Sequence, residues 1–365
     1  MSKIIILGDL FPKQISDFPK INENDFCVAN LECAITNSEN PIKKDGPNLK
    51  ISQADAKIIN ELGINLVGLA NNHIMDYGIE GFNDTISYLD SIGVKHVGNT
   101  IDGNYFVKEI GLKKVCFYFV SEHQFNYFEN DMLGVNVLDQ QNTFNEISVL
   151  KSTCDYLIVC FHGGKEYFLY PTPFQQSICH KFVDCGANLV ICQHSHCVGC
   201  KESYQSATII YGQGNFAFPY RENEHFKTGV IVELTLSDNS QPLVELVPIV
   251  HKERFVVRYA NNEEKIAILD KFNHRSSELE KKSSEALYDA MISECGFDFL
   301  YRLFNKSKLY VRLDTSRFFK NRMMRKYVRK NQKYLLYLYN YFNCETHVEY
   351  IKAILEKQIK NEGKK

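Results

Sequence analysis

Five short motifs rich in carboxylate, amide and imidazole groups recur within the first 216 residues of the chain. They are Gly8-Asp9, Asn30-Leu31-Glu32, Asn71-Asn72-His73, His162-Gly163-Gly164 and His194-Ser195-His196. Carboxylate oxygens, amide oxygens and imidazole nitrogens are common protein ligands of divalent metal ions. Two such ions held side by side activate water for hydrolysis, and one carboxylate can bridge them. Together the motifs predict a two-metal hydrolytic centre.

The two histidines of the last motif are the most specific of these signals. Alternate residues in an extended segment point to opposite sides, so His194 and His196 would serve two different ions or lie on a distorted loop around them. Taken alone, Asp9 also fits an ordinary turn after a glycine, and His162 fits an ordinary buried histidine. The recurrence of all five motifs in one half of the chain favours the metal centre.

The asparagine pair and the histidine at 71–73 combine a metal ligand with a group that transfers protons. One amide oxygen can bind an ion while His73 acts as a general acid or base. Asp76 lies three residues later and is suited to orient the imidazole of His73. Asparagine-rich turns are common, so turn capping by Asn71 and Asn72 is the competing explanation.

Each motif follows an apolar run that predicts a buried strand, and helical patterns separate several of these runs. Strands are expected at 3–7, 26–29, 65–70, 95–97, 114–120, 156–161 and 188–192, and helices at 52–62, 83–91 and 174–185. This alternation predicts an α/β fold that brings the motifs together at strand ends. Three successive strands at 207–211, 228–236 and 243–251 predict an antiparallel element.

Strand patterns stop near residue 261, and helices are expected at 263–272, 276–294 and 318–342. Residues 1–261 hold 20 basic and 30 acidic side chains, whereas 262–365 hold 22 basic and 14 acidic ones. We therefore assign residues 1–260 to an α/β domain and 261–365 to a helical, basic C-terminal region.

The most basic part of the chain is residues 317–333, with eight Lys or Arg side chains and no acidic one. Such a helix fits peripheral contact with an anionic membrane, binding of a polyanionic polymer, or simply a solvated helix face. Nucleic acid is a weaker option because no nucleic-acid-binding module accompanies the basic stretch.

Composition indicates a large folded protein in a reducing compartment. The chain has 365 residues, 44% of them hydrophobic, which suits one large domain with an appended part. No apolar run is long enough for a membrane span, and the first run is too short for a secretory signal. Twelve cysteines without an export signal are expected to be reduced thiols. The sequence therefore predicts a cytoplasmic location, with any membrane contact peripheral at the inner face.

The motifs and their order resemble the CapA family of poly-γ-glutamate capsule biosynthesis proteins, within the metallophosphatase (calcineurin-like phosphoesterase) superfamily. The matching stretches are Gly8-Asp9, Ala29-Asn30-Leu31-Glu32 with Ile35-Thr36, Leu69-Ala70-Asn71-Asn72-His73 with Asp76-Tyr77-Gly78 and Gly81, Phe161-His162-Gly163-Gly164 with Glu166-Tyr167 and Pro171, Asp184-Cys185-Gly186-Ala187, His194-Ser195-His196, and Tyr211-Gly212-Gln213-Gly214-Asn215-Phe216. They cover roughly two thirds of the chain.

The resemblance implies a four-layered sandwich, two mixed β-sheets flanked by helices, with two divalent ions (Mn, Mg, Zn or Fe) at the strand ends. Asp9 and His196 would hold one ion, Asn72, His162 and His194 the other, and Glu32 would bridge them. His73 would act as general acid while a hydroxide between ions ~3.5–4 Å apart attacks the substrate. The family pattern and proximity in sequence suggest five substrate contacts, namely Lys50, Asn71, Glu166, Asn215 and Arg221.

Two positions depart from the wider superfamily in a way that the CapA branch shares. Phe11 stands where many metallophosphatases have a histidine ligand, and Glu32 stands where the usual ligand is aspartate. Fewer nitrogen ligands predict a weaker first ion site or a harder metal such as Mn²⁺ or Mg²⁺.

Three functions fit these residues. The first is a metal-dependent hydrolase of phosphoesterase type in capsule or cell-surface polymer production, acting on an anionic polymer or a phosphorylated substrate. The second is an amide hydrolase that cleaves a γ-glutamyl polymer with the same ions. The third is a non-catalytic assembly component of a polymer-synthesis complex. The complete ligand set, together with His73, is the feature that distinguishes the first from the third, whereas the sequence does not separate the first from the second.

Overall fold

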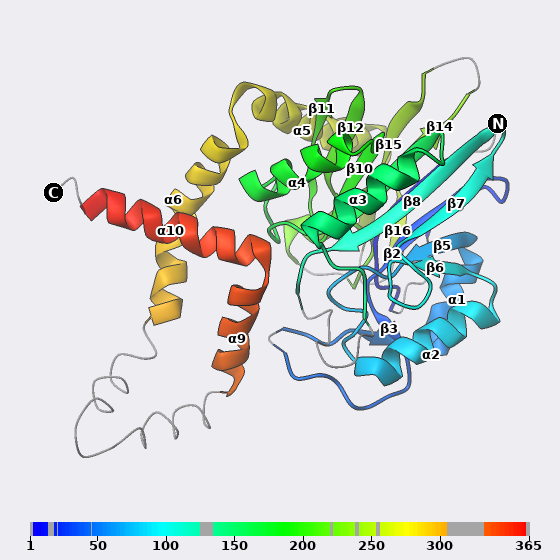
Figure 1. The fold of residues 1–365 in the computed structure, drawn as a ribbon, viewed down its shortest axis with the longest axis horizontal. Coiled ribbons are helices and arrows are strands. Elements are labelled where there is room, and N and C mark those ends of the chain that lie inside the picture. Colours follow the sequence, from blue (N-terminus) through cyan, green and yellow to red (C-terminus); the bar gives the residue numbers. More distant parts are fainter. Residues whose placement is uncertain are drawn as a thin grey trace.

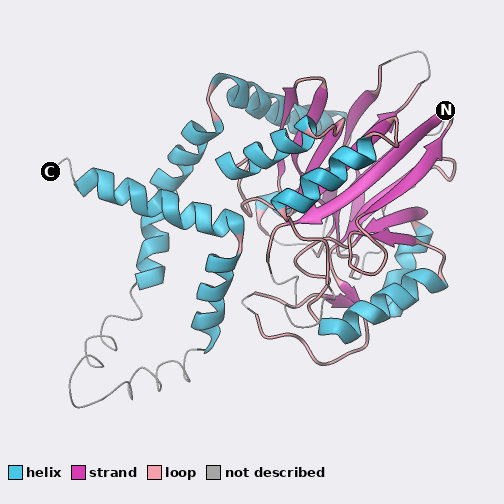
Figure 2. Cartoon of the chain, in the orientation of Figure 1, coloured by secondary structure: helices cyan, strands magenta, loops and turns pink. Residues whose placement is uncertain are grey.

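Two mixed β-sheets lie face to face at the centre of the molecule, and helices cover their outer faces (Figures 1 and 2). The computed structural model describes residues 3–362 apart from 14–17, 20, 45, 125–133, 220–221, 238–240, 253–255 and 305–331. The strands and helices named below lie within these described residues. The arrangement confirms the α/β fold class predicted from the alternating patterns.

The first sheet combines parallel strands with antiparallel strands on one side. Its order is β16 (Val256–Tyr259), β15 (Leu243–Lys252), β14 (Thr228–Thr235), β1 (Ile4–Leu10), β2 (Phe26–Leu31), β5 (Ile64–Gly68) and β6 (Lys95–Val97). Strands β1, β2, β5 and β6 run parallel, whereas β14 and β15 pair antiparallel, as the sequence predicted for that segment. The short β13 (Asn215–Ala217) pairs with β1 beside Asp9.

The second sheet has a parallel centre and antiparallel edges. Its order is β11 (Val198–Tyr204), β12 (Ala207–Gln213), β10 (Leu189–Gln193), β9 (Tyr156–His162), β8 (Lys113–Ser121) and β7 (Tyr105–Ile110). A separate small pair joins β3 (Ala34–Ile35) to β4 (Lys50–Ile51). The sequence analysis missed β7, β11 and β16 because these edge strands carry exposed polar residues instead of continuous apolar runs.

Alternation of side chains along the strands produces three apolar layers. In β1, Ile4 and Ile6 face the layer between the sheets, whereas Ile5 and Leu7 face outward. Helices α1 (Gln53–Glu61) and α2 (Gly78–Ser91) cover the outer face of the first sheet, and α3 (Gln140–Lys151) and α4 (Pro173–Asp184) cover that of the second. This is the four-layered sandwich that the family resemblance implied.

The C-terminal part is helical from residue 262 onward within the described residues. It comprises α5 (Asn262–Lys281), α6 (Ser284–Phe304), α9 (Gln332–Asn343) and α10 (Glu345–Glu362), the last of which contacts α4, α6 and α9 (Figure 1). The predicted start of a helix at Ser276 is wrong. The hydroxyl of Ser276 donates to the carbonyl of Phe272 and accepts from the backbone of Lys201, so this serine lies inside α5.

The basic stretch at 317–333 lies outside the described residues except at its end, where α9 begins at Gln332. The predicted helix at 318–342 is therefore described only from residue 332. In the described part of the chain, no helix combines the length and apolar character needed to cross a lipid bilayer.

Candidate metal centre

The predicted ligands meet at one end of the sandwich, where parallel strands of both sheets end. Asp9 lies near the end of β1, Glu32 follows β2, and Asn72 follows β5; His162 ends β9, and His194 and His196 follow β10. Each of these six residues is at most 7% exposed. Apolar strands from two sheets therefore deliver a set of polar ligand groups to one buried place.

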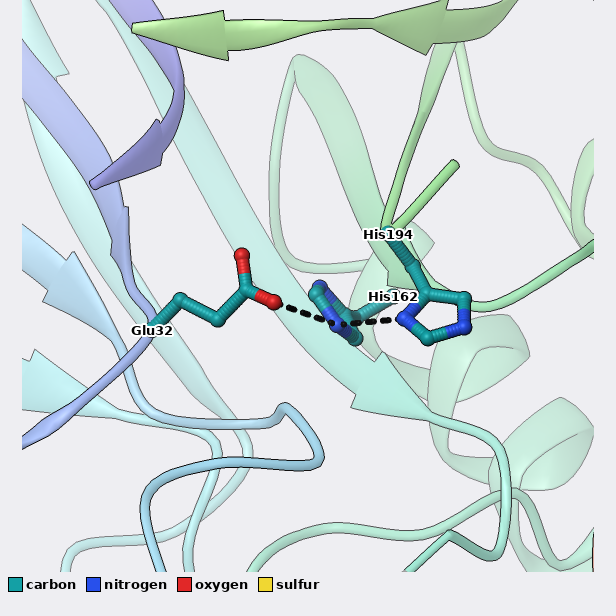
Figure 3. A group of neighbouring side chains, drawn as sticks. All are labelled: Glu32, His162 and His194. Atoms are coloured by element: carbon teal, nitrogen blue, oxygen red, sulfur yellow. Dashed lines mark hydrogen bonds and ion pairs between the residues drawn. The ribbon is translucent and has the colours of Figure 1, made fainter. Parts of the chain in front are cut away.

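Glu32, His162 and His194 form one candidate ligand group, and Figure 3 shows their side chains pointing toward one another. Nε2 of His162 lies 3.2 Å from Nδ1 of His194 and 3.8 Å from Oε1 of Glu32. The amide oxygen of Asn72 lies 3.0 Å from the same Nε2 atom. The ligands predicted for one ion thus converge on one point.

Asp9, Glu32 and His196 form the second candidate group. Oδ2 of Asp9 lies 3.5 Å from Nδ1 of His196, and the amide nitrogen of Asn30 donates to Oδ1 of Asp9 at 2.9 Å. Glu32 belongs to both groups, which is the position expected of a bridging carboxylate. The geometry therefore places the six predicted ligands in two sets that share Glu32.

Cations fit between these groups because the protein leaves important polar atoms unsatisfied there. Among the described residues, neither carboxylate oxygen of Glu32 has a hydrogen-bond partner. Burial, and then the charge of Asp9, raise the pKa of Glu32 well above its ordinary range. A hydrogen on Nε2 of His162 would donate to Asn72, and a cation at this point would take the place of that hydrogen.

The imidazoles in the first group are in the form that binds metal. Burial lowers the pKa of His194 to about 4 and lowers the pKa of His162 well below its ordinary range, so both rings are neutral near pH 7. Burial also lowers the pKa of His196, but the hydrogen bond and charge of Asp9 outweigh it and raise this pKa overall. The contact with Asp9 therefore favours the protonated form of His196.

The loop after β10 is distorted, and its two histidines belong to different candidate ligand groups, so both explanations of the His-x-His spacing hold. The φ angles of His194 and His196 are +88° and +57°, in a region that non-glycine residues rarely adopt. Because the backbone turns at both residues, their rings reach the same centre instead of opposite faces of a strand. Strained residues of this kind persist where the surrounding structure enforces them, as happens at functional sites.

His73 is held beside the ligands by a carboxylate and an ammonium group. Nδ1 of His73 lies 2.7 Å from Oδ2 of Asp76 and 3.1 Å from Nζ of Lys44, and Lys44 also forms a short ion pair with Asp76. Because an ionised carboxylate has only acceptors, Nδ1–H of His73 donates to Asp76, which leaves Nε2 available for proton transfer. The contact predicted between Asp76 and His73 is present.

Lys44 and Asn30 are parts of the site to which the sequence analysis gave no role. Lys44 is buried, yet it lies in a segment without regular structure, where nothing distinguished it from neighbouring lysines. Asn30 was noted only as part of a motif, but its amide group links Asp9, His162 and Asn71. The available signal for Asn30 was a polar residue within an otherwise apolar strand.

Asn71 requires a correction, because the structure gives it a structural role in place of substrate contact. Its amide nitrogen donates to Asn30 Oδ1 and to the carbonyl of Leu31, and its oxygen accepts from the backbones of His73 and Ile74. The residue is completely buried, so no polar atom remains for a substrate. Capping of the loop was the competing explanation for this asparagine.

The other predicted substrate contacts occupy different environments. Oδ1 of Asn215 lies 2.9 Å from Nδ1 of His196, which places Asn215 in the centre itself. Glu166 lies beside the ligands: burial opposes its ionisation, but His194, His196 and Lys165 lower its pKa to about 2. Lys50 instead donates to the carbonyl of Ser38 and to Glu39. Arg221 lies outside the described residues.

Glycine and phenylalanine next to Asp9 have packing roles. A Cβ atom on Gly8 would lie 2.2 Å from the carbonyl oxygen of Gly214, so the close approach of two strands excludes any side chain there. This differs from the expected tight turn, because Gly8 lies within β1. Phe11 is buried against Phe218 with ring centroids 5.4 Å apart, so position 11 supports the centre by packing.

Comparison with known families matches the greater part of the α/β region. The family model described as "Bacterial capsule synthesis protein PGA_cap" matches residues 15–220. The capsule biosynthesis protein CapA of Bacillus anthracis is 27% identical over 247 residues, which are 63% of this chain and 59% of that protein. The PGA biosynthesis protein CapA of Bacillus subtilis is 27% identical over 240 residues, 63% of each chain. The chain thus spans about three fifths of the length of these relatives.

Solved structures with a similar chain path include two enzymes at low sequence identity. A phosphatase from Mycoplasma pneumoniae has a TM-score of 0.43 and 15% identity, covering 68% of this chain and 93% of that one. The NAD nucleotidase of Haemophilus influenzae has a TM-score of 0.44 and 11% identity, covering 78% of this chain and 56% of that one.

Proposed function

The chain belongs to the bacterial capsule synthesis protein family PGA_cap, and from this membership we propose that it is a metal-dependent hydrolase of phosphoesterase type. It would act in the biosynthesis of a capsule or of another cell-surface polymer of the poly-γ-glutamate type. The substrate would be an anionic polymer or a phosphorylated compound.

The observation that carries this proposal is the environment of Glu32. Its two oxygens are buried without a hydrogen-bond partner among the described residues, and ligand groups from both sheets face them. An ionised carboxylate that is buried without hydrogen-bond donors raises the free energy of the folded state. Cations in the two ligand groups would offset this unfavourable energy. A purely structural sheet end would satisfy such a side chain with backbone or side-chain donors.

When bound, two divalent ions would activate a water molecule and withdraw electrons from the scissile bond. The protein itself positions the proton donor. Asp76 and Lys44 contact Nδ1 of His73 and fix its ring, and Nε2 would donate a hydrogen to the leaving group. Burial, and then Lys44, lower the pKa of His73, whereas the negative charge of a bound substrate would raise it.

Metal content and hydrolysis of an aryl phosphate test the proposal together. The wild-type protein, purified without chelator, is compared with His194→Ala, His73→Ala and the control His180→Ala, whose ring contacts Glu202 and Tyr204 on the outer side of the second sheet. We expect up to two ions per chain in the wild type. Activity should depend on them and fall at least about 100-fold in the His194 and His73 variants, with the control unchanged.

The outcomes separate the three functions that the sequence left open. Metal binding with cleavage of a γ-glutamyl peptide but of no phosphate ester would identify an amide hydrolase. Metal binding without any hydrolysis, together with normal polymer production in cells carrying His73→Ala, would identify an assembly component. Absence of bound metal in the wild type would contradict the proposed centre. Membrane contact through the basic stretch and a cytoplasmic location stay predictions.

A further inference from the structure

The turn between α9 and α10 packs against the ends of two central strands of the second sheet. The hydroxyl of Thr346 donates to Oε1 of Glu122 at 2.6 Å, and Sγ of Cys344 lies 3.3 Å from Oε2 of the same carboxylate. Next to it, the backbone and ring of His123 contact the carboxylate of Glu345 at 3.1 and 2.6 Å. The C-terminal helices are therefore attached to the residues that directly follow β8.

Glu122 connects this turn to the loop that carries a metal ligand. Its backbone nitrogen donates to the carbonyl of His162 at 3.1 Å, and its Oε1 accepts from the backbone of Gly164, also at 3.1 Å. The packing is tight, since a Cβ atom on Gly163 would lie 2.8 Å from Cγ of Glu122. One carboxylate thus binds α10 on one side and the ligand loop on the other.

A second part of α10 reaches the same loop. Nζ of Lys165 lies 5.4 Å from the ring centroid of Tyr350, a distance at which a cation interacts with an aromatic face. Oε1 of Glu349 accepts from the backbone of Phe174 at the start of α4. Together with the link through Glu122, these contacts fix the position of α10 beside the metal centre.

We propose that the C-terminal helices are a functional part of the metal centre. Thr346 is a positioning residue that acts through Glu122 to hold residues 163–166, and with them His162, in the geometry for metal binding. The inference rests on the proposed metal centre, and it assigns a role to residues beyond the family match, which ends at residue 220. Outer partners of metal ligands commonly contribute 10–100-fold to metal affinity.

The test uses the full-length chain with Thr346→Val, which keeps the size of the side chain and removes the hydroxyl. Binding of Mn²⁺ alone is measured by titration calorimetry, and backbone hydrogen exchange is measured for peptides covering residues 162–167. We expect Mn²⁺ affinity to fall about tenfold and exchange in the loop to accelerate. Thr346→Ser retains the hydroxyl and should restore both quantities.

Thr143→Val is the matched control, because Thr143 is a buried threonine on α3, which covers the same sheet. It should leave both quantities at wild-type values. If a folded Thr346→Val variant keeps the Mn²⁺ affinity and the loop exchange rate of the wild type, the inference is overturned. It is also overturned if Thr143→Val changes both quantities as much as Thr346→Val does. If the wild type binds no Mn²⁺, the proposed hydrolytic function fails, whereas the exchange measurement still decides whether Thr346 holds the loop.

Discussion

Glu32 is the residue that the two candidate ligand groups share, so the proposed ions would act on it most directly. Without cations, its buried and unpartnered carboxylate opposes folding once it is ionised, because burial and Asp9 raise its pKa. With cations, the same carboxylate becomes the ligand shared by both groups. A substitution that keeps its shape and removes its charge should therefore have opposite effects in the two states.

We expect Glu32→Gln to melt at the same or a higher temperature than the wild type in chelator, and at a lower temperature in excess Mn²⁺. Saturation at 100 times the dissociation constant stabilises the wild type by about 2.7 kcal/mol, and the variant should lose most of this gain. Calorimetric melting of both proteins in both conditions measures the effect. The same order of stability in chelator and in Mn²⁺ would contradict a bridging role.

The ammonium group of Lys44 contributes to the low pKa of His73. Burial first, and then Lys44, lower the pKa of His73, whereas Asp76 raises it. In Lys44→Met, the pKa of His73 should rise, so the imidazolium should persist to higher pH. Proton-detected NMR of the histidine rings follows this titration directly. The variant should also lose stability, by at most about 3–5 kcal/mol, because the buried carboxylate of Asp76 loses its ammonium partner.

Lys50→Met is the control for this substitution, because Lys50 contacts Ser38 and Glu39 and was the lysine that the sequence analysis selected. Its removal should leave the titration of His73 unchanged and cost less than about 1 kcal/mol. A rise in the pKa of His73 in Lys50→Met equal to that in Lys44→Met would refute the assignment.

At the scale of elements, the attachment of α10 depends on pH through Glu122. Burial raises the pKa of this carboxyl to about 7 from its ordinary value of 4.5. At pH values between these two pKa values, the folded state therefore keeps the proton of Glu122, whereas the unfolded state has released it. The contribution of Glu122 to the free energy of unfolding is therefore greatest below about pH 4.5. It decreases as the pH rises to about 7 and changes little above that.

Glu122→Gln imitates the protonated carboxyl and should remove this dependence. Relative to the variant, the wild type should lose at most about 1.4 kcal/mol of unfolding free energy per pH unit within that window. Urea unfolding of both proteins at a series of pH values gives the difference. Parallel stability curves for the two proteins would show that Glu122 is ionised in both the folded and unfolded states.

The sequence predicted those elements and ligands whose signals are local. Apolar runs leading to Asp9, Glu32, His162 and the His-x-His motif mark strands and candidate ligands together, because each of these residues lies at or close to the end of its own strand. The contact between Glu122 and Thr346 joins residues 224 positions apart, and no local pattern relates them. Lys44 escaped prediction for a similar reason, since its partners come from a loop 29 to 32 residues away.

At the scale of the whole molecule, the first C-terminal helix belongs to the core of the sandwich. Ile268 and Phe272 of α5 pack in the apolar layer between the two sheets, and Arg275 donates to the carbonyls of Val198 and Gly199. The helical region thus begins near residue 261, as expected, but its first helix is packed with the α/β part. The division into two domains stays a prediction.

Phe272→Ala should destabilise the entire α/β part by about 3–5 kcal/mol, because it leaves a cavity in that shared layer. Chemical unfolding followed by both fluorescence and circular dichroism measures the loss. Phe342→Ala on α9 is the comparison, since that ring is 66% exposed and its removal should cost little. An unchanged unfolding midpoint in Phe272→Ala would indicate that α5 only rests on the surface.

The meeting of ligands from both sheets also determines when the centre can form during folding. Asp9 and the backbone of His194 are hydrogen-bonded although they are 185 positions apart in the chain, and each belongs to a different sheet. Contacts between such distant segments form only after long loops have closed, so they appear late. The proposed ions would therefore not nucleate this fold. They would bind the finished sandwich and, by joining its two sheets, slow their separation.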